Sequence, residues 1–158
     1  MKEHGTKMQT TAPDNPQSNG VAERMNRTLQ ERARAMMAEA ELSAGGWGEA
    51  IRTTSYMRNR SEVRGLGNRA PQELWRGKVP NISHMREFGC KAYCHLFKKY
   101  RKGKMSDTAW EGVLVRYGEN AVAYRVWDPL KRVVRNVGQP RFDESCPSGW
   151  WKGRKPML

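Results

Sequence analysis

The chain has 158 residues, of which 37% are hydrophobic and 28% charged, and its formal net charge is +13. This composition can form a core, which excludes a disordered polar tail, and no apolar run reaches the roughly 20 residues of a membrane-spanning helix. The first residues lack the apolar centre of a signal peptide, and three cysteines without framework spacing favour reduced thiols. We therefore expect an intracellular protein with no membrane partner.

The basic excess is confined to the later part of the sequence. Residues 1–45 carry six basic and six acidic side chains, whereas residues 46–158 carry 23 basic and 10 acidic ones. A basic surface of this size favours a polyanionic partner, and nucleic acid is the commonest polyanion inside a cell. The alternative is a basic surface that serves only solubility.

Three helices are predicted in the first half of the chain. Residues 21–42 contain neither Pro nor Gly, and apolar side chains recur at helical spacing: Val21, Met25, Leu29, Ala33, Met36 and Ala40. We expect the face that carries Val21, Met25, Leu29 and Met36 either to stay exposed or to find a substitute packing partner. Asn19 is placed to cap the start of this helix. Shorter helices are expected over residues 47–59 and 71–76.

From residue 88 the hydrophobic period changes to two. Five short runs rich in Val, Tyr and Phe predict strands at 90–96, 111–117, 121–127, 132–137 and 140–142. Such short strands, separated by turn signals, favour a small barrel or rolled sheet. Of the tryptophans, we expect Trp47, Trp75, Trp110 and Trp127 in the core, and Trp150 and Trp151 exposed in a basic tail.

Two polar features could contact a phosphate backbone. On the long helix, four polar residues fall within about 60° of one another at 100° per residue: Glu23, Arg27, Gln30 and Arg34. They form either a metal-binding carboxylate beside phosphate-binding arginines or an ordinary solvated face with a Glu23–Arg27 ion pair. A basic run in the first strand connection is expected to bind phosphate without reading sequence, through Lys98, Lys99, Arg101, Lys102 and Lys104.

Several segments in order resemble the copia-type LTR-retrotransposon integrases, within the DDE retroviral-type integrases. They are PQSNGVAERMNRTL (16–29), WGEA (47–50), PQELWRGKVPNISHMREFGCKAYCH (71–95), GENAVAYRVWDPLKRVV (118–134) and FDE (142–144). The resemblance implies an α+β chain in which the C-terminal remnant of an RNase H-like integrase core precedes a small Src-homology-3-like β-barrel. The implied division is residues 1–45 for the core remnant, 46–85 for a helical linker region, 86–144 for the barrel and 145–158 for a tail.

The resemblance also implies roles for individual residues. Glu23 matches the family's catalytic glutamate, which helps two aspartates to hold a pair of Mg or Mn ions. The loop before the helix matches a segment that approaches the DNA end. The nucleic-acid contacts expected in this region are Gln17, Asn19, Gly20, Arg24, Arg27, Gln30 and Arg34. The implied reaction is DNA integration by metal-dependent polynucleotidyl transfer, in the nucleus, on element ends and target DNA.

The two family aspartates have no match in this sequence, since Asp14 lies only nine residues before Glu23. One carboxylate cannot hold two divalent ions, so we expect this chain alone to be an inactive polyprotein fragment that keeps nucleic-acid binding and binds no metal by itself. RNA binding and self-association stay open. The alternative function is a non-catalytic basic module that binds nucleic acid or protein. Zinc is not expected, because Cys90 and Cys94 lack paired-ligand spacing.

Overall fold

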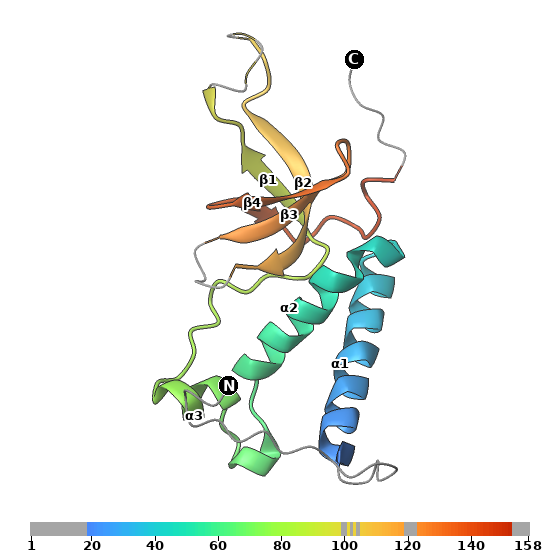
Figure 1. Ribbon diagram of the computed structural model, residues 1–158. Helices are drawn as coiled ribbons and strands as arrows, with labels where there is room; N and C mark the ends of the chain where they lie inside the picture. The colour runs from blue at the N-terminus through green and yellow to red at the C-terminus, as the bar shows by residue number, and fades with distance from the viewer. Residues whose placement is uncertain (1–18, 99–100, 102, 104, 119–122, 153–158) are drawn as a thin grey trace, which may run out of the picture.

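The computed structural model describes residues 19–98, 101, 103, 105–118 and 123–152. Helices come first, followed by a sheet, so the α+β class is confirmed (Figure 1). The helices are α1 (Gly20–Glu39), α2 (Trp47–Arg60) and α3 (Pro71–Arg76), with short 3-10 turns η3 (Ala44–Gly46) and η4 (Arg64–Leu66). The strands are β1 (Lys91–His95), β2 (Ala109–Tyr117), β3 (Tyr124–Asp128), β4 (Val133–Val137) and β5 (Arg141–Asp143).

Helix α1 is closed at its C-terminal end and open at its start. The N–H of Glu41 donates to the carbonyl of Ala38 (3.1 Å) and that of Leu42 to the carbonyl of Met37 (3.0 Å), and Glu41 has a φ of 52°. This is a Schellman motif with glutamate where glycine is usual. The predicted cap at Asn19 is wrong: its side chain makes no capping hydrogen bond, because its backbone (φ −108°, ψ 7°) is not in the extended conformation of an N-cap.

Helix α1 packs with only part of its apolar surface. Ala33 and Met37 of α1 form a buried cluster with Ala50 of α2. Val21, at the start of α1, is 82% exposed. At 100° per residue the buried side of α1 lies roughly 80° around the helix from the face of Val21, Met25, Leu29 and Met36, which stays partly exposed, one of the two expected outcomes. The reason is that the shorter α2 supplies the cover, and the small Ala33 and Ala50 allow the two helices to approach closely.

The sheet is antiparallel, with strands in the order β4-β3-β2-β1-β5. Strand β2 is the central strand and pairs with β1 on one side and β3 on the other. Val113 lies opposite Lys91 of β1 and opposite Trp127 of β3. A bulge between Leu114 and Arg116 interrupts the pairing with β3. Leu114, Val113 and Val126 are fully buried. The predicted strands are confirmed within the described residues, with β2 beginning two residues earlier than expected; residues 121–122 of the third predicted strand lie outside them.

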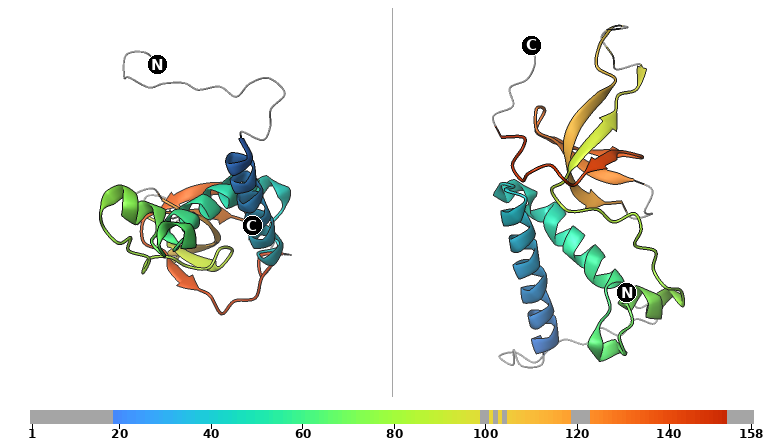
Figure 2. Two further views of the ribbon diagram at one scale, coloured as in Figure 1. Left: turned by 90° about the horizontal axis from the view of Figure 1, so that it is seen from below. Right: turned by 180° about the vertical axis from the view of Figure 1, so that it is seen from behind.

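The segment after β5 folds back onto the sheet and meets the end of α1 (Figure 2). Trp151 is 7% exposed and packs against Val113 and Val115, and Lys152 forms an ion pair with Glu41. The prediction that Trp151 is exposed is therefore wrong. Periodicity is no guide in such a segment, because its burial depends on the sheet face to which it returns.

The short helix α3 leaves its tryptophan in solvent. Trp75 is 89% exposed, so its predicted core position is wrong. The buried anchor of this region is Ala70, at 4% exposure, and Gly77 ends the helix with a φ of 67°. A helix of six residues presents one narrow face to α2, and Trp75 lies outside that face. Within the described part of the chain, no helix has the length and apolar content needed to cross a bilayer.

Candidate nucleic-acid interface

The polar stripe predicted on α1 lies in solvent. Glu23, Arg27, Gln30 and Arg34 are all exposed, and Arg24 beside them is exposed as well. Eleven residue steps at about 1.5 Å each give the stripe a length of roughly 16 Å on one continuous helix. Since the backbone of a 20-residue helix is rigid, the two arginines keep a fixed spacing that a phosphate backbone can meet.

The start of α1 carries the residues that were expected to approach a DNA end. Asn19 is exposed, and a Cβ added at Gly20 would meet no atom within 4 Å. The described protein neighbours therefore do not require glycine at this position. Gln17 lies outside the described residues.

The predicted basic loop is described only at Lys98, Arg101 and Gly103 of residues 98–104. Lys98 is exposed, while the Arg101 guanidinium donates through Nε to the Leu96 carbonyl at 2.9 Å. Lys99, Lys102 and Lys104 lie outside the described residues. The ends of β1 and β2 that flank this loop are far from the start of α1 (Figure 1). The structure does not bring Glu23 and the basic loop into one site.

The described residues do not fit a two-metal centre. They contain no group of three or more His, Cys, Asp or Glu side chains that could hold a metal ion. Glu23 is the one carboxylate among the four residues of the stripe on α1. Two divalent ions need more oxygen ligands than one carboxylate supplies. Asp128 of β3 stabilises the turn that follows it: its Oδ1 accepts hydrogen bonds from the N–H groups of Leu130 and Lys131, at 3.1 Å each.

Cys90 and Cys94 are buried free thiols. Cys90 is 6% exposed and Cys94 is fully buried, and burial raises the pKa of each thiol to about 12. Carboxylates add to this effect, Glu144 most strongly at Cys90 and Asp128 at Cys94. A metal ligand must be a thiolate, so this environment opposes zinc binding.

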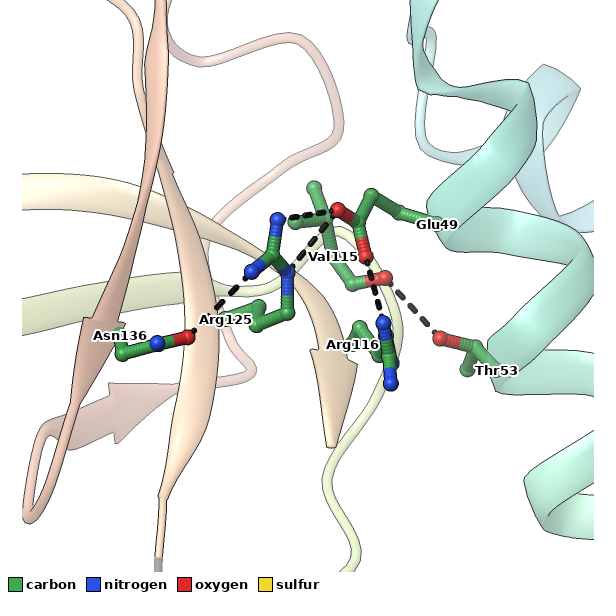
Figure 3. A network of polar contacts seen from close by, with 6 residues as sticks. All are labelled: Glu49, Thr53, Val115, Arg116, Arg125 and Asn136. Carbon is green, nitrogen blue, oxygen red and sulfur yellow. Dashed lines mark hydrogen bonds and ion pairs between the residues drawn. The ribbon is translucent and has the colours of Figure 1, made fainter. Parts of the chain in front are cut away.

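A carboxylate that sequence reasoning missed ties the helices to the sheet. Figure 3 shows Glu49 of α2 between two arginines: Arg125 donates through Nε (2.9 Å) and Nη2 (2.6 Å) to its Oε1, and Arg116 lies 3.7 Å from its Oε2. On the same face of α2, the Thr53 hydroxyl donates to the Val115 carbonyl at 3.0 Å. Glu49 offsets one of these two positive charges, so the cluster keeps a net charge of +1.

The sheet and its C-terminal extension define the class of this half of the chain. Residues 90–155 match the family described as Retroviral polymerase SH3-like domain. The match includes the returning segment that buries Trp151 and extends beyond the predicted barrel limit at residue 144. This half is therefore an SH3-like domain of the retroelement type.

Curated relatives cover both the helices and the sheet. The chain is 40% identical over 142 residues to the Retrovirus-related Pol polyprotein from transposon TNT 1-94 of Nicotiana tabacum, which is 90% of this chain and 11% of that protein. It is 29% identical over 147 residues to the corresponding polyprotein from transposon RE1 of Arabidopsis thaliana, covering 91% and 10%, and 26% identical over 146 residues to that from RE2, covering 92% and 10%. No solved structure matches significantly.

The chain belongs to the Pol polyproteins of copia-type retrotransposons. It spans about a tenth of the length of these three polyproteins. The resemblance stated from the sequence is thereby confirmed at the level of the family.

Proposed function

We propose that this chain is the part of a copia-type integrase that holds DNA during integration. In this proposal its partners are element ends and target DNA, in the nucleus, and α1 belongs to the end of an RNase H-like core. The observation that carries the proposal is the exposed stripe on α1, where Arg27 and Arg34 lie on the same face as Glu23. A DNA backbone laid along this face meets two cations at fixed spacing.

Glu23 is then one ligand of a Mg or Mn site completed by carboxylates elsewhere in the polyprotein. The described residues of this chain do not hold such ions by themselves. In isolation the chain accordingly binds DNA without strand transfer. The competing function is that of a basic binding module that does not derive from an enzyme. Under this alternative, neither Glu23 nor the helix face that carries it has a special role.

Fluorescence anisotropy with a labelled DNA duplex across a salt series tests the proposal. Each phosphate contact contributes about one unit to the slope of log affinity against log salt, so Arg27→Ala with Arg34→Ala should lower the slope by about two. Arg32→Ala is the matched control, because Arg32 is an exposed arginine about 180° around the same helix. Equal slopes for the double variant and the wild type would contradict the proposal.

A second arm addresses Glu23 directly. Glu23→Gln removes a negative charge beside the expected DNA path, so the duplex affinity should rise slightly while strand transfer with Mn stays absent in both proteins. Strand transfer by the wild-type chain that Glu23→Gln abolishes would show that the chain alone completes a metal site. That result would refute the predicted inactivity.

A further inference from the structure

The most exposed aromatic side chain of the helical region stands in a cationic cavity. A cavity of about 390 Å³ lies between α2 and α3. It is lined by Asn59 and Arg60 of α2 and by Pro71, Gln72, Trp75 and Arg76 of α3. This volume lies within the range of small-molecule sites. Figure 1 shows α3 beside the C-terminal half of α2, which is why both helices contribute to the cavity wall.

The charged side chains that line this cavity are all positive. Its two charged residues are Arg60 and Arg76, and neither pairs with a carboxylate among the described residues. Burial lowers the pKa of Arg60; Tyr56 opposes this shift, and the nearby charge of Arg76 adds a smaller lowering. Two guanidinium groups that repel each other are stabilised when an anion binds between them.

The geometry of Arg60 is also fixed in advance. Its guanidinium carbon lies 3.3 Å from the centre of the Tyr56 ring, and its Nη1 donates to the Tyr56 carbonyl at 3.2 Å. An arginine stacked in this way loses little freedom on binding a phosphate. Trp75, by contrast, has 89% of its surface free, so the face of its indole is open to a flat ligand.

Two amides complete the lining. Asn59 and Gln72 can each donate and accept hydrogen bonds, and the Gln72 Oε1 has no donor among the described residues. A ring that stacks on an indole, a hydrogen-bonding edge and a phosphate together describe a nucleotide. A base can reach the indole face only when it is unpaired, since a paired base is stacked within its duplex.

We propose that this cavity binds an unpaired nucleotide of single-stranded nucleic acid, with the base stacked on Trp75 and the phosphate held by Arg60 and Arg76. The site is separate from the stripe on α1 and goes beyond the duplex binding proposed above. Its test therefore has a different ligand, and either proposal can fail while the other stands.

The experiment uses the full chain and a single-stranded oligonucleotide of about 16 nucleotides that contains 2-aminopurine, whose fluorescence is quenched by stacking. Trp75→Ala should weaken binding by about 5- to 100-fold and abolish the protein-dependent quenching, whereas Trp75→Phe should keep part of both. Leu74→Ala is the matched control, since Leu74 is 42% exposed on the same helix and does not line the cavity. Arg76→Ala should weaken binding and reduce its salt dependence.

Fold integrity and specificity are checked in parallel. Trp75 is exposed, so Trp75→Ala should leave the Tm unchanged, and duplex affinity should stay within about twofold of the wild type. Unchanged single-strand affinity in Trp75→Ala would overturn the proposal, as would an equal loss for duplex and single strand. Loss of self-association without loss of single-strand binding would assign Trp75 to a protein contact and overturn it too.

Discussion

The two ends of α1 differ in how their apolar side chains are covered. Ala33, Met37 and Ala40 near the C-terminal end are at most 8% exposed, whereas Val21 at the start is 82% exposed. The covered end is held by α2 and by the chain that enters the sheet, through Ala50 and Phe88. The open end carries Glu23, and its contact with α2 there includes the Arg58 guanidinium, whose Nε donates to the Met25 sulfur at 3.0 Å.

The largest loss of stability is expected from a substitution at Gly89, which lies against Ala40 at the C-terminal end of α1. Gly89 has a φ of 89°, and a Cβ there would collide with the Cβ of Ala40. Gly89→Ala should lower the free energy of unfolding by about 3 kcal/mol, since it adds backbone strain to a steric overlap. Urea denaturation measures the change. Gly48→Ala is the control: a Cβ at Gly48 meets nothing within 4 Å, and the variant should be neutral or slightly more stable.

The next effect loosens the contact between α2 and the sheet. Glu49→Ala leaves Arg125 and Arg116 without their shared carboxylate, and a loss of about 2 kcal/mol is expected for such partly buried charged hydrogen bonds. Urea denaturation again reports the change. Glu39→Ala removes an exposed glutamate of α1 and should change stability by less than about 0.5 kcal/mol. Equal losses in the two variants would show that the Glu49 network contributes nothing special.

A smaller effect concerns pH. Burial, then the charges of Arg60 and Arg86, lower the pKa of His84, whose Nε2 lies 2.7 Å from the Tyr56 hydroxyl. The unfolded chain therefore binds a proton more readily than the folded one, and stability falls as the pH drops through the ordinary histidine value of about 6.5.

Thermal melts at about pH 7.5 and about pH 5.5 check this expectation. His84→Gln keeps a hydrogen-bonding side chain near Tyr56 and should reduce the difference in Tm between the two pH values. His95→Gln, on the exposed side of β1, should leave that difference unchanged. A pH effect that persists in full in His84→Gln would assign it to another group.

The smallest effect belongs to the open end of α1. Val21→Ser should change stability by less than about 0.5 kcal/mol, because Val21 has no cover to lose. Ala33→Leu, at a fully buried position between two helices, should cost about 2 kcal/mol by overpacking. A large loss in Val21→Ser would mean that the first turn of α1 packs against another surface in solution, and the contrast between the two ends would disappear.

Local pattern was sufficient to predict most elements. The start of α3 follows from Pro71, and β4 follows from alternation around Val134, because both depend on neighbouring residues alone. The exposed stripe on α1 was predicted on the same basis. The prediction for Trp75 failed because the exposure of this apolar side chain depends on tertiary packing, here on the short length of α3.

The Glu49 network could not be predicted for a related reason. Glu49 and Arg125 are 76 residues apart, and nothing in the local sequence distinguishes either from a solvated charge. Trp151 is a similar case, since its burial requires Val113 and Val115 on a strand far away in the sequence. Long-range contacts of this kind appear only when the chain is folded.

The position of β5 beside β1 has a consequence for how the chain is made. Lys91 pairs with Asp143, about fifty positions later, whereas β1–β2, β2–β3 and β3–β4 pair neighbours in sequence. During synthesis the first hairpins can form as they leave the ribosome, but the outer edge of β1 stays unpaired until residues 141–143 emerge. An interruption of translation, or a proteolytic cut, between β4 and β5 would leave that edge open to other chains, and aggregation is the expected fate of such a product.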